Sequence, residues 1–366
     1  MAEVIGLVTA NYAVKHQSVL TEYRPAASLP YGGRYRAVDF ALSNLVNAGI
    51  RTVGMVMPFD YRSLIDHLES GRDWALDRKN GGLFMLPGSS FGTSRTGSRF
   101  LLRDIRKNLV YLKRTTAEYV ICTSASFVYN ADLNELIEAH TLSGADITML
   151  VNTAKADDDD VIKLETTKGR VKDISYGVHF GDVEFLDCFI LSVDLLCRLI
   201  EWHKAIDYMD LFEAIKAENG FEHIDIQTFT HKGYAAALFN KDNYYKRSME
   251  LLKPEVNDSL FPANRAIKTK AHDNPPAKYE KDCTVHNTVI SAGCRIYGCV
   301  SDSILGRDVV VEPGACVRNS IIYQGCVVKR GARVEHAIID KNNVVNPGCD
   351  LRGTPDSIFV KEKGLR

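Results

Sequence analysis

The sequence has 366 residues, of which 45% are hydrophobic and 25% are charged, with a formal net charge of -1. Such a chain folds into globular domains rather than staying disordered, and it is long enough for two of them. The near-zero charge excludes the basic bias typical of proteins that bind nucleic acids or anionic membranes, so we expect neither partner.

The N-terminus lacks the charged and then apolar segments of an export signal, and no apolar run approaches the ~18 residues of a membrane-spanning helix. The nine cysteines are odd in number and form no Cys-x-x-Cys pair, which indicates reduced thiols rather than disulfides or zinc ligands. We therefore expect a cytoplasmic protein that holds no metal ion by itself.

Residues 1–254 alternate short β-rich runs with helical patterns, which is typical of an α/β domain around a largely parallel sheet. In chain order, the predicted elements are a strand at 4–8, a helix at 36–48, a strand at 52–57, helices at 61–69 and 100–114, a strand at 119–123, a helix at 133–140, a strand at 185–191, helices at 193–203 and 210–216, a strand at 234–238 and a helix at 242–252. The four consecutive aspartates at 157–160 are interpreted as a solvated loop, because adjacent carboxylates cannot all face one metal ion.

The opening strand is followed by residues 10–17. In an α/β protein, the loop after the first strand usually binds phosphate. Such a loop needs glycine for close approach of its backbone, yet no glycine occurs between Gly6 and Gly32.

After Pro254 the alternation of strand and helix patterns ends, and residues 255–282 have the Asn- and Pro-rich composition of a linker. Beyond it a unit of 17 residues recurs, with aliphatic residues every six positions, as at Leu305, Val311 and Val317. This spacing predicts a parallel β-helix over residues 283–353, followed by a C-terminal tail at 354–366. The repeat units are residues 303–319, 320–336 and 337–353.

Hexapeptide β-helices also occur in acyltransferases, in which a histidine at the coil edge acts as a base, so His286 and His336 are candidates for that role. Three or four coils behind an α/β domain are more often an oligomerising module, which is the interpretation that we favour.

Residues 30–50 (PYGGRYRAVDFALSNLVNAGI) closely resemble the segment that follows the phosphate loop in bacterial glucose-1-phosphate adenylyltransferases, the ADP-glucose pyrophosphorylases. Residues 71–78, 117–120 and 243–252 resemble the same family in the same order. The resemblance implies a Rossmann-like nucleotide-diphospho-sugar transferase domain followed by a left-handed β-helix. It also implies an enzyme family that makes ADP-glucose and pyrophosphate from ATP and glucose 1-phosphate for glycogen biosynthesis.

The residues that the resemblance marks as catalytic are replaced. The family's two metal-binding aspartates fall on Ser126 and Ala237, and its Glu-Lys-Pro motif has no match. Phosphoryl transfer depends on positioned amides, cations and Mg²⁺, so we expect no catalytic residues and little or no activity alone. The family's glycine-rich loop and the lysine that follows it fall on positions occupied here by Asn11, Tyr12, Val14, His16 and Ala26.

Some members of this family are catalytically poor D-type subunits that assemble with an active C-type subunit and alter its activity. The losses in this chain match that subunit, which implies a regulatory subunit in a tetramer-like hetero-oligomer, with Mg²⁺ only in the catalytic partner. Two alternatives stay open. One is an active adenylyltransferase that positions phosphates with Lys15 and His16, and the other is a stand-alone sensor of sugar phosphates or nucleotides.

The resemblance also implies an effector site for a phosphorylated metabolite, at basic positions that match Arg24, Arg36 and Arg72. The planar guanidinium of arginine suits a bidentate contact with phosphate. The alternative is that each arginine pairs with a surface carboxylate, such as Asp39 or Asp73.

Overall fold

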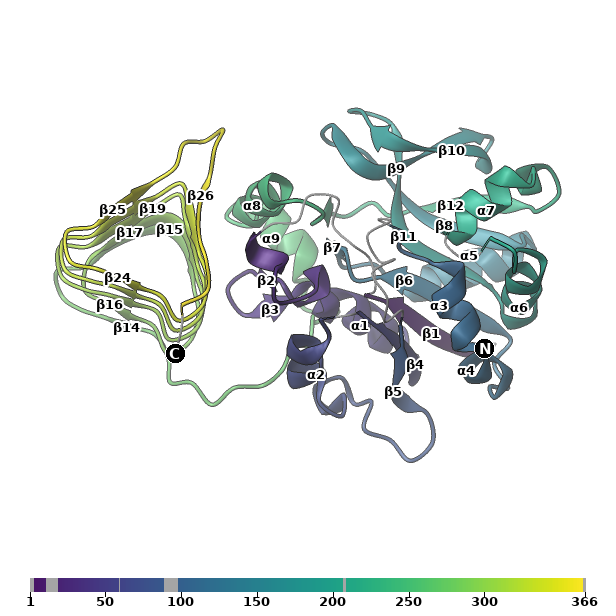
Figure 1. The fold of residues 1–366 in the computed structure, drawn as a ribbon, viewed down its shortest axis with the longest axis horizontal. Coiled ribbons are helices and arrows are strands. Elements are labelled where there is room, and N and C mark those ends of the chain that lie inside the picture. The colour runs from purple at the N-terminus through teal and green to yellow at the C-terminus, as the bar shows by residue number, and fades with distance from the viewer. Residues whose placement is uncertain (1–2, 11–18, 59, 89–97, 207–208, 365–366) are drawn as a thin grey trace.

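The computed structural model describes residues 3–10, 19–58, 60–88, 98–206 and 209–364. An α/β domain and a triangular stack of short strands lie side by side (Figure 1). The expected architecture, an α/β domain followed by a parallel β-helix, is confirmed. In the described part of the chain no helix is both long and apolar enough to span a membrane.

The α/β domain contains a nine-stranded sheet in the order β5-β4-β1-β6-β11-β8-β12-β10-β9. The first four strands of this order run parallel, whereas β11 is antiparallel to β6 and β8, and β9 and β10 form an antiparallel hairpin. Strand β12 is again parallel to β8, so the sheet is mixed rather than largely parallel as predicted. The strands are β1 (Val4–Thr9), β4 (Thr52–Met57), β5 (Gly82–Pro87), β6 (Tyr119–Ser124), β8 (Ile147–Thr153), β9 (Asp158–Thr167), β10 (Arg170–Val178), β11 (Val183–Ser192) and β12 (Ile226–Thr230).

Helices cover both faces of the sheet because alternate residues of each buried strand point to opposite faces. Ile5 and Leu7 of β1 belong to the core that α3, α6 and α7 cover, whereas Val8 belongs to the core under α1, α2 and α5. The helices are α1 (Ala37–Asn47), α2 (Arg62–Leu68), α3 (Leu102–Lys107), α4 (Leu109–Lys113), α5 (Leu133–Ser143), α6 (Val193–Trp202), α7 (Leu211–Ala217), α8 (Lys241–Glu250) and α9 (Pro254–Leu260).

Two details of the α/β domain differ from the prediction. The helix expected at 100–114 is broken into α3 and α4, because the Asn108 side chain donates to the carbonyl of Asp104 (2.8 Å) and so competes with helical bonding. The acidic run is not a solvated loop, since three of its four residues open β9 and Asp158 is buried, accepting from Asn243 Nδ2 at 2.7 Å.

The β-helix repeats in the predicted register. Val311, Val328 and Val345 stack in one column of parallel strands and are all fully buried. The first coil is shorter than the 17-residue repeat, as the pairing of Thr284 with Cys299 shows. Its strands are β14 (Lys278–Tyr279), β15 (Thr284–Ile290), β16 (Arg295–Ile296), β17 (Cys299–Leu305), β18 (Val310–Val311), β19 (Cys316–Arg318), β20 (Ile321–Ile322), β21 (Val327–Val328), β22 (Arg333–Glu335), β23 (Ala337–Ile339), β24 (Val344–Val345), β25 (Asp350–Arg352) and β26 (Phe359–Lys361).

Regular structure also occurs in the segments expected as linker and tail. Helix α9 begins with Pro254 at its first turn, where the missing N–H of proline costs no hydrogen bond. Strand β14 precedes residue 283, and β26, within the expected tail, pairs with β23 and adds a strand to the last coil.

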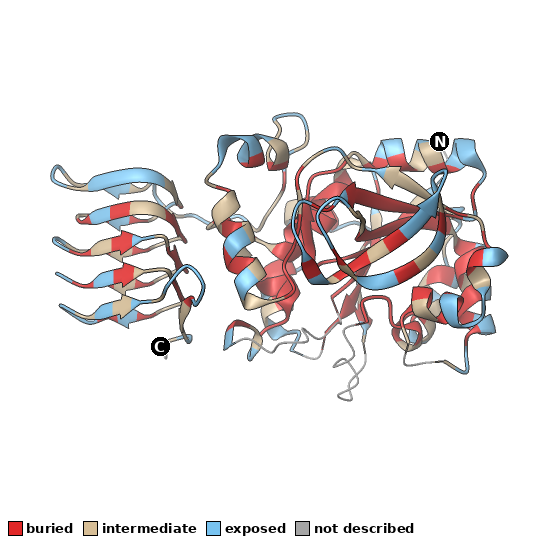
Figure 2. Cartoon of the chain, turned by 90° about the horizontal axis from the view of Figure 1, so that it is seen from above, coloured by how far each residue is buried: buried red, intermediate tan, exposed pale blue. Residues whose placement is uncertain are grey.

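The two domains pack against each other through a buried interface, and Figure 2 shows the stacked coils beside the α/β domain. Arg24 and Asp340 form a buried ion pair across it. The Tyr323 hydroxyl donates to that of Tyr244 (2.8 Å), and the Tyr245 hydroxyl donates to the carbonyl of Asn319 (2.6 Å). The β-helix is therefore docked on the α/β domain rather than merely tethered to it.

The Asp340→Asn variant tests this interface. The substitution leaves the Arg24 guanidinium buried without its counter-charge, so we expect the free energy of unfolding to fall by about 3 kcal/mol in urea titrations. Glu312→Gln is the control, because Glu312 pairs with Lys329 on the open surface of the β-helix and should cost less than about 1 kcal/mol. Equal losses in the two variants would contradict a stabilising role for the buried pair.

Candidate functional site

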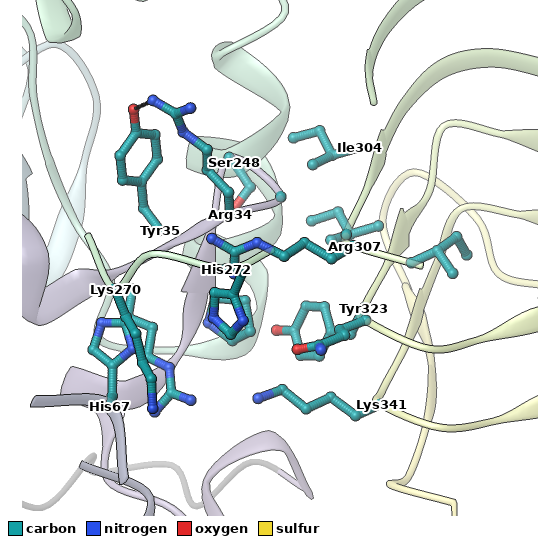
Figure 3. Close-up of a pocket in the computed structure, with 18 of the residues that line it drawn as sticks. Arg34, Tyr35, His67, Ser248, Lys270, His272, Ile304, Arg307, Tyr323 and Lys341 are labelled. Carbon is teal, nitrogen blue, oxygen red and sulfur yellow. Dashed lines mark hydrogen bonds between the residues drawn. The ribbon is translucent and has the colours of Figure 1, made fainter. Parts of the chain in front are cut away.

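A cavity of about 240 Å³ lies between the α/β domain and the β-helix (Figure 3). Its α/β wall includes the turn between β2 (Pro30–Tyr31) and β3 (Tyr35–Arg36), and its other wall is an edge of the β-helix. The charged and imidazole side chains that line it are Arg34, Arg36, Asp66, His67, Lys270, His272, Arg307 and Lys341.

On the α/β side, Arg36 is fixed by the start of helix α1. Its backbone N–H donates to Asp39 Oδ2 (2.9 Å), and its guanidinium donates to the carbonyl of Ser63 (2.5 Å). Burial lowers the pKa of Arg36 to about 10, so the side chain keeps its charge at neutral pH. The Arg34 guanidinium lies 4.6 Å from the centre of the Tyr35 ring and also donates to the Tyr35 hydroxyl.

On the β-helix side, the repeat places polar side chains in one column. Arg307, Gln324 and Lys341 occupy the same position of three successive coils, 17 residues apart, and all three line the cavity. Adjacent strands are separated by ~4.8 Å, so these side chains form a closely spaced row. Burial, and then the charge of Arg34, lowers the pKa of Arg307.

Positive charge is in excess in this cavity. Among the described residues that line it, five are arginines or lysines and Asp66 supplies the one carboxylate. His67 is bound to Asp39 (2.6 Å), and burial lowers the pKa of both His67 and His272. A half-enclosed space lined by several guanidinium and ammonium donors is suited to a small anion, above all a phosphate group.

The three arginines predicted as effector ligands are not together. Arg36 lines the cavity, whereas Arg24 is buried behind it, paired with Asp340 and 5.8 Å from the centre of the Tyr323 ring. Arg72, in a 3-10 helix at Arg72–Trp74, is exposed and lies outside the lining. The cavity residues that the sequence reading missed are Arg34, Lys270, His272, Arg307 and Lys341. The sequence contains one signal for two of them, because Arg307 and Lys341 occupy the same position of the 17-residue repeat and must therefore lie on the same face of the β-helix.

By the resemblance, the family's glycine-rich loop falls on residues 11–17 of this chain. The loop positions Asn11, Tyr12, Val14, Lys15 and His16 fall outside the described residues.

Ser126 and Ala237, the positions where the resemblance expects metal-binding aspartates, are adjacent in space. Strand β7 (Phe127–Tyr129) pairs with β13 (Ala235–Ala237), and the N–H of Leu238 donates to the carbonyl of Ser126 (2.9 Å). Ser126 and Ala237 are both buried, and so is Ala26 at the lysine position.

A buried ion pair lies beside Ser126. The Ser126 hydroxyl donates to Asp187 Oδ2 (3.2 Å), the Ser124 hydroxyl donates to the same oxygen (2.9 Å), and Arg99 pairs with it. The Arg99 guanidinium lies 4.5 Å from the centre of the Phe239 ring, two residues after Ala237.

This donor set does not fit Mg²⁺, which prefers several unpaired oxygens including carboxylates. The carboxylate present, that of Asp187, is already neutralised by a side chain of the same protein. Among the described residues, no group of three or more His, Cys, Asp and Glu side chains is placed to hold a metal ion.

Comparison with known proteins agrees with both halves of the fold. Residues 275–355 match the family model described as GlmU-like, C-terminal hexapeptide. The chain is 33% identical to the glycogen biosynthesis protein GlgD of Bacillus subtilis over 370 aligned positions, which cover 99% of this chain and 96% of that protein. For GlgD of Geobacillus stearothermophilus the identity is 34% over 365 positions, with 99% and 96% covered. The chain belongs to the GlgD family.

The GlgD family chain is also 27% identical to the glucose-1-phosphate adenylyltransferase of Thermotoga neapolitana, over 86% of this chain and 76% of that enzyme. The resemblance to bacterial glucose-1-phosphate adenylyltransferases that residues 30–50 suggested is thereby confirmed, and the α/β domain is related to those of nucleotidyltransferases.

Inorganic phosphate tests the cavity of this GlgD family protein. A ligand that binds only the folded state raises the melting temperature, so we expect phosphate to raise it in the wild type. Arg307→Gln should weaken phosphate binding about tenfold, because it removes one charge-assisted donor. Arg72→Gln, outside the cavity, should have no effect at equal ionic strength. Equal weakening by both variants would refute the assignment of the site.

The Arg99→Met variant tests the buried pair. Burial raises the pKa of Asp187 to about 6, above its value of ~4 in an unfolded chain, so its ionisation costs stability above pH 6 and nothing below about pH 4. Arg99 offsets that cost, and we expect its loss to lower the free energy of unfolding by about 3 kcal/mol at pH 8 and by much less at pH 5.

The matched control for this experiment is Arg170→Met, because Arg170 pairs with Asp225 at the surface, where both side chains are more than a third exposed. Chemical unfolding at the two pH values measures both variants. A deficit in Arg99→Met that does not depend on pH would show that packing on Phe239, and not charge neutralisation, is what Arg99 contributes.

Proposed function

We propose that this chain is a regulatory, non-catalytic subunit of glucose-1-phosphate adenylyltransferase in glycogen biosynthesis. It modulates a catalytic homologue that makes ADP-glucose and pyrophosphate from ATP and glucose 1-phosphate. The observation that carries the proposal is the replacement of both metal-binding positions by Ser126 and Ala237, beside a carboxylate that Arg99 neutralises. Mg²⁺ is then required only in the catalytic partner.

The cationic cavity supports the regulatory part of the proposal. It receives side chains from both domains, so a phosphorylated metabolite bound there contacts Arg36 on one side and Arg307 on the other. Binding energy of this kind depends on the relative position of the two domains. A ligand that favours one arrangement shifts the population toward it, which is how an effector site changes the behaviour of an assembly.

The partner in this proposal is the catalytic C-type homologue, in a hetero-oligomer that resembles a tetramer. We also place the protein in the cytoplasm, because all nine cysteines are free thiols, as is usual in a reducing compartment.

The decisive experiment measures initial rates of ADP-glucose synthesis with Mg²⁺ for this chain alone, for the catalytic homologue alone and for the two co-expressed. We expect no turnover by this chain, because losing even one electrostatic contact to the transition state lowers rates by about 10² to 10³. The mixture should differ from the homologue in kcat, KM or effector response.

Robust turnover by the isolated chain would overturn the proposal and favour an active enzyme that uses Lys15 and His16. Co-expression with an Arg307→Gln variant separates the two parts of the proposal. Assembly and the basal rate of the mixture should persist, whereas its response to a phosphorylated effector should weaken about tenfold.

A further inference from the structure

Lys270 and Lys341 both line the cavity, and their environments differ. The positive charge of Lys270 is compensated, since its ammonium pairs with Glu69 (2.5 Å) and donates to the carbonyl of Asp66 (2.7 Å). Lys341 extends from the β-helix across the cavity with its amine directed toward the α/β domain (Figure 3). Within the described part of the chain, its amine forms no hydrogen bond and no ion pair.

The surroundings of Lys341 disfavour its protonated form. Arg36, Arg24 and Lys363 face it with positive charge, and the nearby Asp340 already pairs with Arg24. Burial, and then the charges of Arg36 and Arg24, lowers the pKa of Lys341 to about 7. A substantial share of this side chain is therefore a neutral amine at physiological pH, which is the nucleophilic form of lysine.

The same cavity holds donors for a phosphate group. The guanidinium groups of Arg34, Arg36 and Arg307 line it together with Lys341. A neutral amine next to such a group of cations is the combination that a reagent with a phosphate leaving group requires. The cations bind the phosphate, hold the reagent close to the amine and stabilise the negative charge that builds up on the departing oxygen.

We propose that Lys341 is a modification site for small acyl phosphates, the mixed anhydrides of a carboxylic acid and phosphoric acid. The neutral amine attacks the acyl carbon, an amide bond forms between Nζ and the acyl group, and the bond from the acyl carbon to the phosphate oxygen breaks. Inorganic phosphate leaves with the electron pair, and the proton lost from nitrogen passes to phosphate or water. No oxidant, reductant or further reactant is needed.

The inference rests on the cavity being the anion site of the proposed function, and it adds a form of regulation to that site. An acylated Lys341 cannot be protonated, so the positive charge that its protonated form contributes to the cavity is lost for as long as the amide bond lasts. Later binding of a phosphorylated effector is then weaker. The covalent modification keeps the affinity low after the acyl phosphate itself is gone.

The test is acetylation of the full-length chain by acetyl phosphate near pH 7, followed by quantitative peptide mass spectrometry. We expect Lys341 to be modified at least about tenfold faster than Lys270, because an ordinary lysine is almost entirely protonated at this pH. Inorganic phosphate should slow the reaction at Lys341 and leave Lys270 unchanged. Lys270 is the matched control, since it lines the same cavity but is paired with Glu69.

Acetic anhydride reacts with neutral amines but lacks a phosphate group. It therefore measures the reactivity of the amine without any contribution from phosphate binding by the arginines. Equal rates at Lys341 and Lys270 with both reagents would overturn the inference. A fast reaction of Lys341 with the anhydride alone would overturn the acyl phosphate class. Phosphate-dependent stabilisation of the unmodified protein is measured separately, so the inference can fail while the anion site of the proposed function stands. Lys341→Gln, which resembles the acylated side chain, should weaken that stabilisation about tenfold.

Discussion

The close contact between the β2–β3 turn and the β-helix is the constraint on which the rest of this structure depends. Gly33 has a φ of +77°, and a Cβ atom at this position would lie 2.8 Å from the carbonyl oxygen of Leu305. Any side chain would push the two domains apart. The same interface buries the Arg24–Asp340 pair, so backbone approach and charge pairing hold the β-helix against the α/β domain.

This docking of the two domains has an electrostatic consequence. Cations from both domains face each other across a small cavity, and their mutual repulsion raises the free energy of the empty state. Burial first, and then this repulsion, lowers the pKa values of Arg307 and Lys341. An anion relieves the repulsion and contacts both domains at once, so ligand binding and the packing of the domains are thermodynamically linked. Stability and anion affinity are therefore properties of the same interface.

A buried carboxylate lies beside Ser126, a position where the resemblance expects a metal-binding aspartate. Asp187 has a φ of 50°, a left-handed backbone conformation that residues other than glycine rarely adopt. Its carboxylate is turned toward Ser124, Ser126 and Arg99. The backbone strain and the burial of charge are offset by the guanidinium. A permanent cation of the chain thus balances the buried carboxylate, and the pair contributes to the stability of this region of the core.

The sequence by itself determined what is local or periodic. The 17-residue spacing fixed the β-helix and its register, because one aliphatic residue per face must point inward in every coil. The sequence also shows Ser126 and Ala237 at the two positions where the resemblance expects aspartates. Tertiary structure alone decided the cavity, since Arg36 and Lys341 are far apart in the chain and only domain docking brings them together. It also decided the strand at Asp158, where a side-chain partner distant in sequence, Asn243, outweighs local preference.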